Sequence, residues 1–93
     1  MTEKTVRIII SGRVQGVAYR AWTVATAREL GLSGWVRNLS DGNVEVVFSG
    51  DENKIFTMLE KCKDGPPAAI VKDVKKYSEK ENPSPGFHQL PSL

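Results

Sequence analysis

The chain has very few residues of the kinds that bind transition metals or form covalent cross-links. Its 93 residues include one cysteine, Cys62, and one histidine, His88. A single cysteine cannot form an internal disulfide, and a structural zinc site usually needs four ligands, mostly cysteine or histidine. These absences exclude a disulfide scaffold and a zinc cluster, although carboxylates could still hold a hard cation weakly. We expect Cys62 to be a small buried hydrophobic residue and His88 to be solvated.

Long hydrophobic runs and a strong net charge are also absent. The longest apolar run, residues 6–10, is interrupted by Arg7 and is far too short to span a bilayer. The opening Met-Thr-Glu-Lys-Thr has no apolar segment of the kind found in signal peptides, so we expect a cytoplasmic protein with no membrane partner. The net charge of +2 does not suggest nucleic-acid binding, but it mildly favours anionic small molecules.

The length and the hydrophobic pattern indicate one small α+β domain spanning residues 1–93. The composition, 40% hydrophobic and 26% charged, fits a single core. Apolar alternation predicts strands at residues 5–11, 34–40, 43–49 and 69–77, the last with a bulge because its alternation slips by one residue. Asp41-Gly42 predicts a tight hairpin between the second and third strands.

Helical spacing predicts two helices between these strands. The first covers residues 21–30 and ends at Gly31, and the second is capped by Ser49 or Asp51 and stops near Gly65. The residues that share a face are Thr23, Val24, Ala27 and Leu30 in the first helix and Ile55, Met58, Leu59 and Cys62 in the second. Residues 87–90 can add a short edge strand. The order β-α-β-β-α-β predicts a ferredoxin-like α/β sandwich, with two helices on one face of an antiparallel sheet.

The segment that joins the first strand to the first helix has the composition of an anion-binding site. It reads Gly12-Arg-Val-Gln-Gly-Val-Ala-Tyr-Arg20. Glycine lets the backbone turn its N–H groups toward one point, and the first N–H groups of a helix lack internal partners and favour negative charge. Arg20 can add a bidentate contact to a phosphate. Without an anion, Arg20 would face the positive end of the helix dipole, whereas Arg13 could equally be a solvated loop charge.

The predicted topology brings Asn38 toward the same segment. The second strand runs parallel to the first through a right-handed crossover, and Asn38 lies about 13 Å along it from Gly34. A neutral amide can orient a water toward phosphorus without taking a proton, although Asn38 could also be an ordinary strand residue. Because no strong general base is visible nearby, these residues suit a substrate with a good leaving group, such as an acyl phosphate.

At these residues the sequence resembles the acylphosphatase family. The resemblance rests on the segment just quoted, on Leu30-Gly-Leu-Ser-Gly-Trp-Val-Arg-Asn38, and on Asp41-Gly-Asn-Val-Glu45. It implies a metal-free, cofactor-free hydrolase that cleaves small-molecule acyl phosphates into a carboxylate and phosphate. It also implies that Asn38 positions the attacking water. The residues implied to bind the phosphate, through loop amides and the guanidinium, are Gln15, Gly16, Val17, Ala18, Tyr19 and Arg20. We expect a monomer.

One residue and one segment depart from the family pattern. Tyr19 stands where the family usually has phenylalanine, so the aromatic body is kept and only the hydroxyl needs a partner. The C-terminal Phe87-His-Gln-Leu-Pro-Ser-Leu93 lacks the family's usual basic or aromatic strand ending. We therefore expect the last strand to be short or displaced, with consequences for edge packing rather than for chemistry.

Two other functions stay open from the residues alone. The same element order builds RNA-recognition domains, but those carry stacking aromatics within a basic motif on the open sheet face, and Phe48 alone is insufficient. The domain could also be a phosphate-handling accessory domain for carbamoyl phosphate supplied to a partner. The sequence does not name the acyl group, because the recognisable motif addresses only the phosphate.

Overall fold

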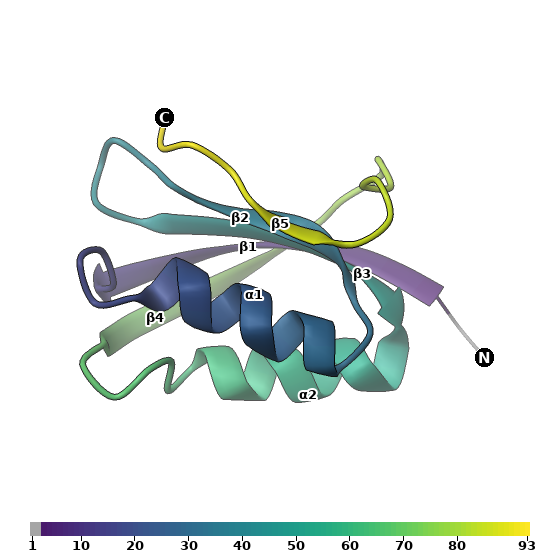
Figure 1. The fold of residues 1–93 in the computed structure, drawn as a ribbon, viewed down its shortest axis with the longest axis horizontal. Helices are drawn as coiled ribbons and strands as arrows, with labels where there is room; N and C mark the ends of the chain where they lie inside the picture. Colours follow the sequence, from purple (N-terminus) through teal and green to yellow (C-terminus); the bar gives the residue numbers. More distant parts are fainter. Residues whose placement is uncertain (1–2) are drawn as a thin grey trace.

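The computed structural model describes residues 3–93 and arranges them as two helices on one face of a five-stranded sheet (Figure 1). In chain order the elements are β1 (Glu3–Arg13), α1 (Tyr19–Glu29), β2 (Ser33–Asn38), β3 (Val44–Asp51), α2 (Glu52–Cys62), β4 (Ile70–Ser78) and β5 (Phe87–Gln89). The predicted ferredoxin-like order is confirmed, including the short final strand. Helix α1 begins at Tyr19 rather than near residue 21, so its first turn lies inside the predicted anion-binding segment.

The strand order in the sheet is β4-β1-β3-β2-β5. The first four strands pair antiparallel, as predicted, but β5 pairs parallel to β2, so the sheet is mixed. The reason lies in the chain path: β4 ends at the opposite end of the sheet from Asn38, and a strand that starts there beside β2 must run in the same direction as β2. Strand β5 therefore ends beside Val36, two residues before Asn38, and runs toward the end of the sheet where the loop after β1 lies.

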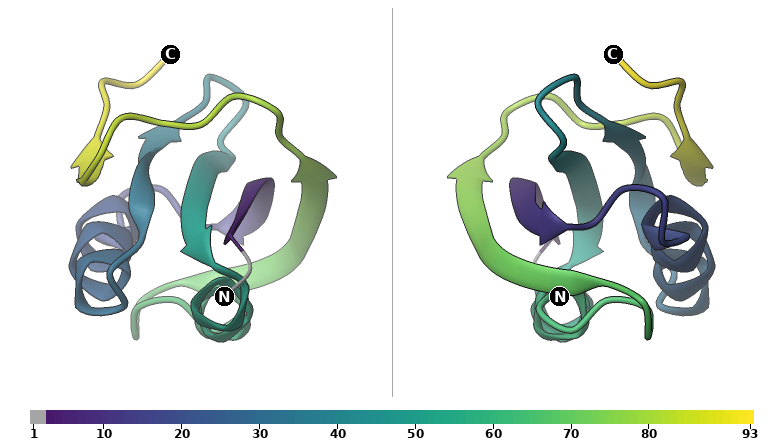
Figure 2. Two further views of the ribbon diagram at one scale, coloured as in Figure 1. Left: turned by 90° about the vertical axis from the view of Figure 1, so that its right-hand side faces the viewer. Right: turned by 90° about the vertical axis from the view of Figure 1, so that its left-hand side faces the viewer.

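The core lies between the sheet and the two helices. End-on views show α1 beneath β2 and β5, and α2 beneath β1 and β3 (Figure 2). In the pairing of β1 with β3, Ile8 lies opposite Val46 and Ile10 opposite Val44, and all four side chains are buried. Each fully buried side chain of this size stabilises the fold by about 1.5–3 kcal/mol. The isoleucine alternation thus makes β1 a central strand, as predicted.

The helix faces also agree largely with the predicted patterns. The buried helix residues are Tyr19, Thr23 and Ala27 in α1 and Ile55, Met58 and Cys62 in α2. Val24, Leu30 and Leu59 are only partly buried against the core. Of the two predicted caps for α2, the structure uses Asp51, whose carboxylate accepts the N–H of Asn53 at 3.0 Å. None of the helices within residues 3–93 is long and apolar enough to cross a membrane.

The predicted bulge in β4 lies opposite the end of β1. Ser11 pairs with Asp73 and Gly12 with Val71, so Lys72 is the extra residue. Gly12 has a φ of 123°, and a side chain there would collide with the backbone of Ile70. Only glycine lets β1 pass this close to β4 just before the chain turns toward α1.

The short strand β5 is held firmly at the sheet edge. Phe87 is buried and stacks on Phe48 with ring centroids 5.6 Å apart. The guanidinium of Arg28 donates two hydrogen bonds to the Phe87 carbonyl, at 2.9 and 3.2 Å. His88 is exposed, as predicted, and its Nε2 lies 3.2 Å from the carbonyl oxygen of Pro85. The last strand is therefore short, as predicted, and well anchored.

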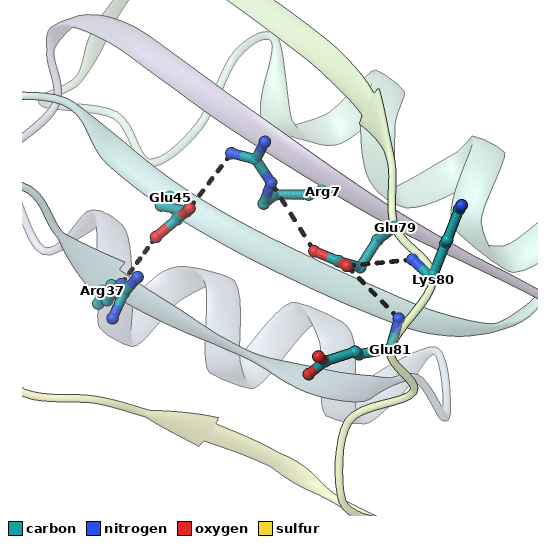
Figure 3. A network of polar contacts seen from close by, with 6 residues as sticks. All are labelled: Arg7, Arg37, Glu45, Glu79, Lys80 and Glu81. Carbon is teal, nitrogen blue, oxygen red and sulfur yellow. Dashed lines mark hydrogen bonds and ion pairs between the residues drawn. The ribbon is translucent and has the colours of Figure 1, made fainter.

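The sheet face opposite the helices carries a network of charged side chains (Figure 3). Glu45, only 8% exposed, accepts from Nε of Arg37 at 2.7 Å and from an Nη of Arg7 at 3.3 Å. The Arg7 guanidinium also lies 4.6 Å from the Tyr77 ring centroid, and that of Arg37 lies 4.8 Å from the Trp35 centroid. Both arginines are thus engaged within the sheet. This face is not the free basic and aromatic platform that an RNA-recognition domain requires.

Candidate active site

The loop of residues 14–18, here called the anion loop, connects β1 to α1 through two left-handed residues. Gly16 has a φ of 73°, and Ala18 has a φ of 64° and a ψ of 24°. Within residues 3–93, Ala18 is the only residue other than glycine with a positive φ. Left-handed residues in a short turn are typical of concave arrangements of backbone N–H groups that bind anions. A strained alanine at such a position often marks a functional site.

The first turn of α1 leaves its N–H groups available to a ligand. Ala18 is the N-cap, and within the described part of the chain no side chain caps the helix and no acidic residue occupies its first turn. The first intrahelical bond is donated by the N–H of Trp22 to the carbonyl of Ala18, at 3.0 Å. The preceding N–H groups of this turn therefore have no intrahelical acceptor, and the positive end of the helix dipole favours an anion beside them.

A pocket of about 150 Å³ opens beside this turn. Its lining residues are Val14, Gly16, Ala18, Tyr19, Arg20, Ala21, Asn38 and Gln89. Arg20 comes from the start of α1 and Asn38 from the end of β2, so the structure brings the two predicted catalytic residues to one pocket. Figure 2 (right) faces this end of the molecule, with the anion loop leading into α1. Arg20, Asn38 and the residues at the uncapped start of α1 thus border a space of small-molecule size.

Three residues of the predicted segment lie away from this pocket. Val17 does not line it and packs partly buried against the core. Gln15 does not line it either, because its side chain turns to the hairpin between β2 and β3, where Nε2 donates to the carbonyls of Leu39 and Asn43. Arg13 is exposed at the end of β1 and is not among the lining residues, which favours the solvated reading of that arginine.

Tyr19 lines the pocket, but its hydroxyl is directed into the core. The hydroxyl donates to the Cys62 carbonyl at 2.6 Å, so it has the partner that the sequence analysis required. Burial, followed by the neighbouring Cys62, raises the pKa of Tyr19 well above its ordinary value of 10.0. The hydroxyl therefore stays neutral and bound, and it is not available as a base. Its ring meets that of Trp22 edge to face, at 5.4 Å between centroids.

Gln89 lines the pocket but is not among the site residues predicted from the sequence. Strand β5 was predicted, but its partner was not, and only the pairing of Gln89 with Val36 carries the side chain to the pocket. The hydrogen bond from the Leu90 N–H to the Val36 carbonyl, at 2.8 Å, fixes this register. No local pattern in the sequence indicates that the Gln89 side chain borders a pocket.

A larger cavity, of about 650 Å³, lies at the other end of the sheet. It is lined by the first residues of β1, the last residues of β3 and the segment after β4, including Thr5, Ser49 and Asn82. None of the predicted site residues borders it. The larger cavity therefore differs in lining from the smaller pocket, which has Arg20, Asn38 and the uncapped start of α1 on its walls. Across residues 3–93, no cluster of three or more His, Cys, Asp or Glu side chains is placed to hold a metal ion.

The comparison with known families decides the identity of this arrangement. A family model described as acylphosphatase matches residues 6–89. The chain belongs to the acylphosphatase family. The acylphosphatase of Rhodospirillum rubrum is 52% identical over 90 residues, which cover 97% of this chain and 99% of that relative. The acylphosphatase resemblance stated from the sequence is thereby confirmed.

Solved acylphosphatase structures share the fold closely. An acylphosphatase from Coxiella burnetii is 36% identical, with a TM-score of 0.90, over 95% of this chain and 93% of that one. An acylphosphatase from Bacillus subtilis is 33% identical, with a TM-score of 0.88, over 96% of this chain and 99% of that one. These identities and coverages support an acylphosphatase, a hydrolase, as the enzyme class of this chain.

Proposed function

We propose that this acylphosphatase hydrolyses the carboxyl-phosphate bond of small acyl phosphates without a metal, with the phosphate on the anion loop and Arg20 and the attacking water on Asn38. The observation that carries the proposal is the pocket itself, which has Arg20, Asn38 and the uncapped start of α1 on its walls. A second cavity has Lys4 and Lys76 beside the start of α2, but that helix is capped by Asp51 and carries Glu52 in its first turn, so it offers less to an anion.

The anion loop and Arg20 supply the binding of the phosphoryl group. N–H groups at the start of α1 donate to the phosphate oxygens, and the guanidinium adds a bidentate, charge-assisted contact. Together they offset the negative charge that would otherwise repel an oxygen nucleophile. A guanidinium and backbone dipoles thus provide the charge stabilisation that many phosphoryl-transfer enzymes obtain from a metal ion.

Asn38 supplies the orientation of the nucleophile. Its carboxamide can accept a hydrogen bond from a water while donating to the phosphate, which holds the water oxygen in line with phosphorus. The water oxygen bonds to phosphorus as the bond from phosphorus to the carboxyl oxygen breaks. The carboxylate leaves with the electron pair, and the proton of the water passes to phosphate or solvent. Because a carboxylate is a weak base, its departure needs no general acid.

Hydrolysis of benzoyl phosphate by three purified variants tests these roles. We expect Arg20→Ala to lower kcat/KM by about 10²–10³-fold, with most of the loss in phosphate binding. We expect Asn38→Ala to lower kcat by about the same factor while inhibition by inorganic phosphate is kept. Arg13→Ala is the matched control, since it removes an arginine that does not border the pocket. Wild-type turnover by folded Arg20→Ala or Asn38→Ala would show that the assigned roles are wrong.

A further inference from the structure

The side chain of Gln15 connects the two walls of the pocket. Its Nε2 donates to the carbonyl of Leu39 at 2.8 Å and to the carbonyl of Asn43 at 2.9 Å. A carboxamide nitrogen carries two protons, so both donors are used. Gln15 immediately precedes Gly16 of the anion loop, and Leu39 immediately follows Asn38. The two hydrogen bonds therefore join the anion loop to the hairpin that follows the proposed water-binding residue, Asn38.

The hairpin does not need Gln15 in order to close. The carbonyl of Leu39 also accepts the N–H of Gly42 at 3.2 Å, and the carbonyl of Asn43 accepts the N–H of Leu39 at 2.9 Å. The carboxylate of Asp41 further accepts the N–H of Asn43 at 3.0 Å. Both carbonyls would thus keep a partner if the Gln15 side chain were removed, and the loss of stability would be modest.

Within residues 3–93, no other hydrogen bond joins the anion loop to this hairpin. The ladder between β1 and β3 ends at the pair of Ile10 and Val44, before the loop begins. Asn38 itself is fixed in the sheet by its pairing with Val44 and by the N–H of Leu93, which donates to its carbonyl at 3.0 Å. The Gln15 side chain is thus the polar link that sets where the loop lies relative to Asn38.

We propose that Gln15 is a positioning residue: its carboxamide sets the separation between the bound phosphate and Asn38, and thereby aligns the attacking water. The inference rests on the proposed role of Asn38. Misplacement of a reacting group by about 1 Å can cost on the order of 100-fold in rate. The link is therefore worth more to turnover than to stability.

A double-mutant cycle on kcat for benzoyl phosphate tests the proposal. Gln15→Met keeps a long unbranched side chain and removes both donors. We expect it to lower kcat by about tenfold or more, while the inhibition constant of inorganic phosphate changes by less than about threefold. In an Asn38→Ala background, where no carboxamide remains to be aligned, the same change should alter kcat by less than about twofold.

Two further variants separate positioning from general loss of stability. Thr5→Val removes two hydrogen bonds, to Ser49 and Asn82, at the other end of the same sheet, and we expect it to keep the wild-type kcat. Gln15→Leu also removes both donors and adds no charge beside the phosphate, so it should also lower kcat and replaces Gln15→Met if that variant does not fold. Urea unfolding of each variant reports its stability.

Each other outcome overturns the positioning role. A wild-type kcat in folded Gln15→Met would show that the link does not affect turnover, while the proposed function would stand if Asn38→Ala is impaired. An equal loss in both backgrounds would mean that Gln15 acts independently of Asn38. A rise in the phosphate inhibition constant with no change in kcat would assign Gln15 to phosphate binding alone. A wild-type kcat in Asn38→Ala would refute the proposed function as well.

Discussion

Replacing Glu45 by glutamine should remove the charge that holds two arginines on the open face of the sheet. Its side chain is 10% exposed and lies 2.7 Å from Nε of Arg37 and 3.3 Å from an Nη of Arg7. Glutamine keeps the shape but not the charge, so Arg37 would lose its carboxylate partner and Arg7 would keep only Glu79, 3.8 Å from its Nε. Because the three residues come from β3, β2 and β1, the change weakens contacts across the centre of the sheet.

The burial of the three side chains sets the magnitude. Removing one partner of a fully buried ion pair costs about 3–5 kcal/mol, whereas an exposed pair contributes about 0.2–1 kcal/mol. The side chains of Arg7 and Arg37 are 32% and 28% exposed, so water screens part of the interaction. We expect Glu45→Gln to lower the free energy of unfolding by about 2 kcal/mol. For a domain of this size that corresponds to a drop in Tm of roughly 8–16 °C.

Urea unfolding followed by tryptophan fluorescence provides the assay, with Glu52→Gln as the matched control. Glu52 also lies 2.7 Å from a cation, the Nζ of Lys4, but the two side chains are 46% and 55% exposed. The same substitution at the same contact distance should therefore cost less than about 1 kcal/mol, including the loss of a charge from the first turn of α2. Equal effects of the two substitutions, or no loss of stability in Glu45→Gln, would refute the argument from burial.

Three further outcomes follow from the packing. Tyr19→Phe should lower the free energy of unfolding by about 1–2 kcal/mol in urea unfolding, because the Cys62 carbonyl loses its 2.6 Å donor. Burial raises the pKa of Cys62 from 9.0 to about 12, so above about pH 9 the unfolded state loses the thiol proton first and stability falls with pH. Cys62→Ala should make that decline shallower in unfolding measured from pH 8 to 11, and an unchanged slope would exclude the thiol as its source. Gly34→Ala should cost about 1–3 kcal/mol more than Gly42→Ala, or prevent folding. Both glycines have a positive φ, but only at Gly34 would a side chain also meet the Val47 carbonyl and the Phe87 ring. Comparable unfolding midpoints for these two alanine variants would contradict the steric reason.

The sequence predicted the local elements well because each depends on residues close together in the chain. The alternation around Ile8 and Ile10 sets β1, and Asp41-Gly42 sets the hairpin. The anion loop could be located for the same reason, since its glycines and Arg20 are neighbours in the chain. The start of α1 was placed too late because its N-cap, Ala18, is not a residue type that signals a helix start.

Periodicity, turn residues and the two motif blocks are local properties, so the elements, their order and the family could be predicted before folding was considered. Three contacts could not: the parallel pairing of β5 with β2 that brings Gln89 to the pocket, the reach of Gln15 to the hairpin beyond Asn38, and the bridge that Glu45 makes between two arginines. Each of these contacts joins strands or loops distant in the chain. Their geometry follows from strand register and chain path, which depend on how the whole core packs.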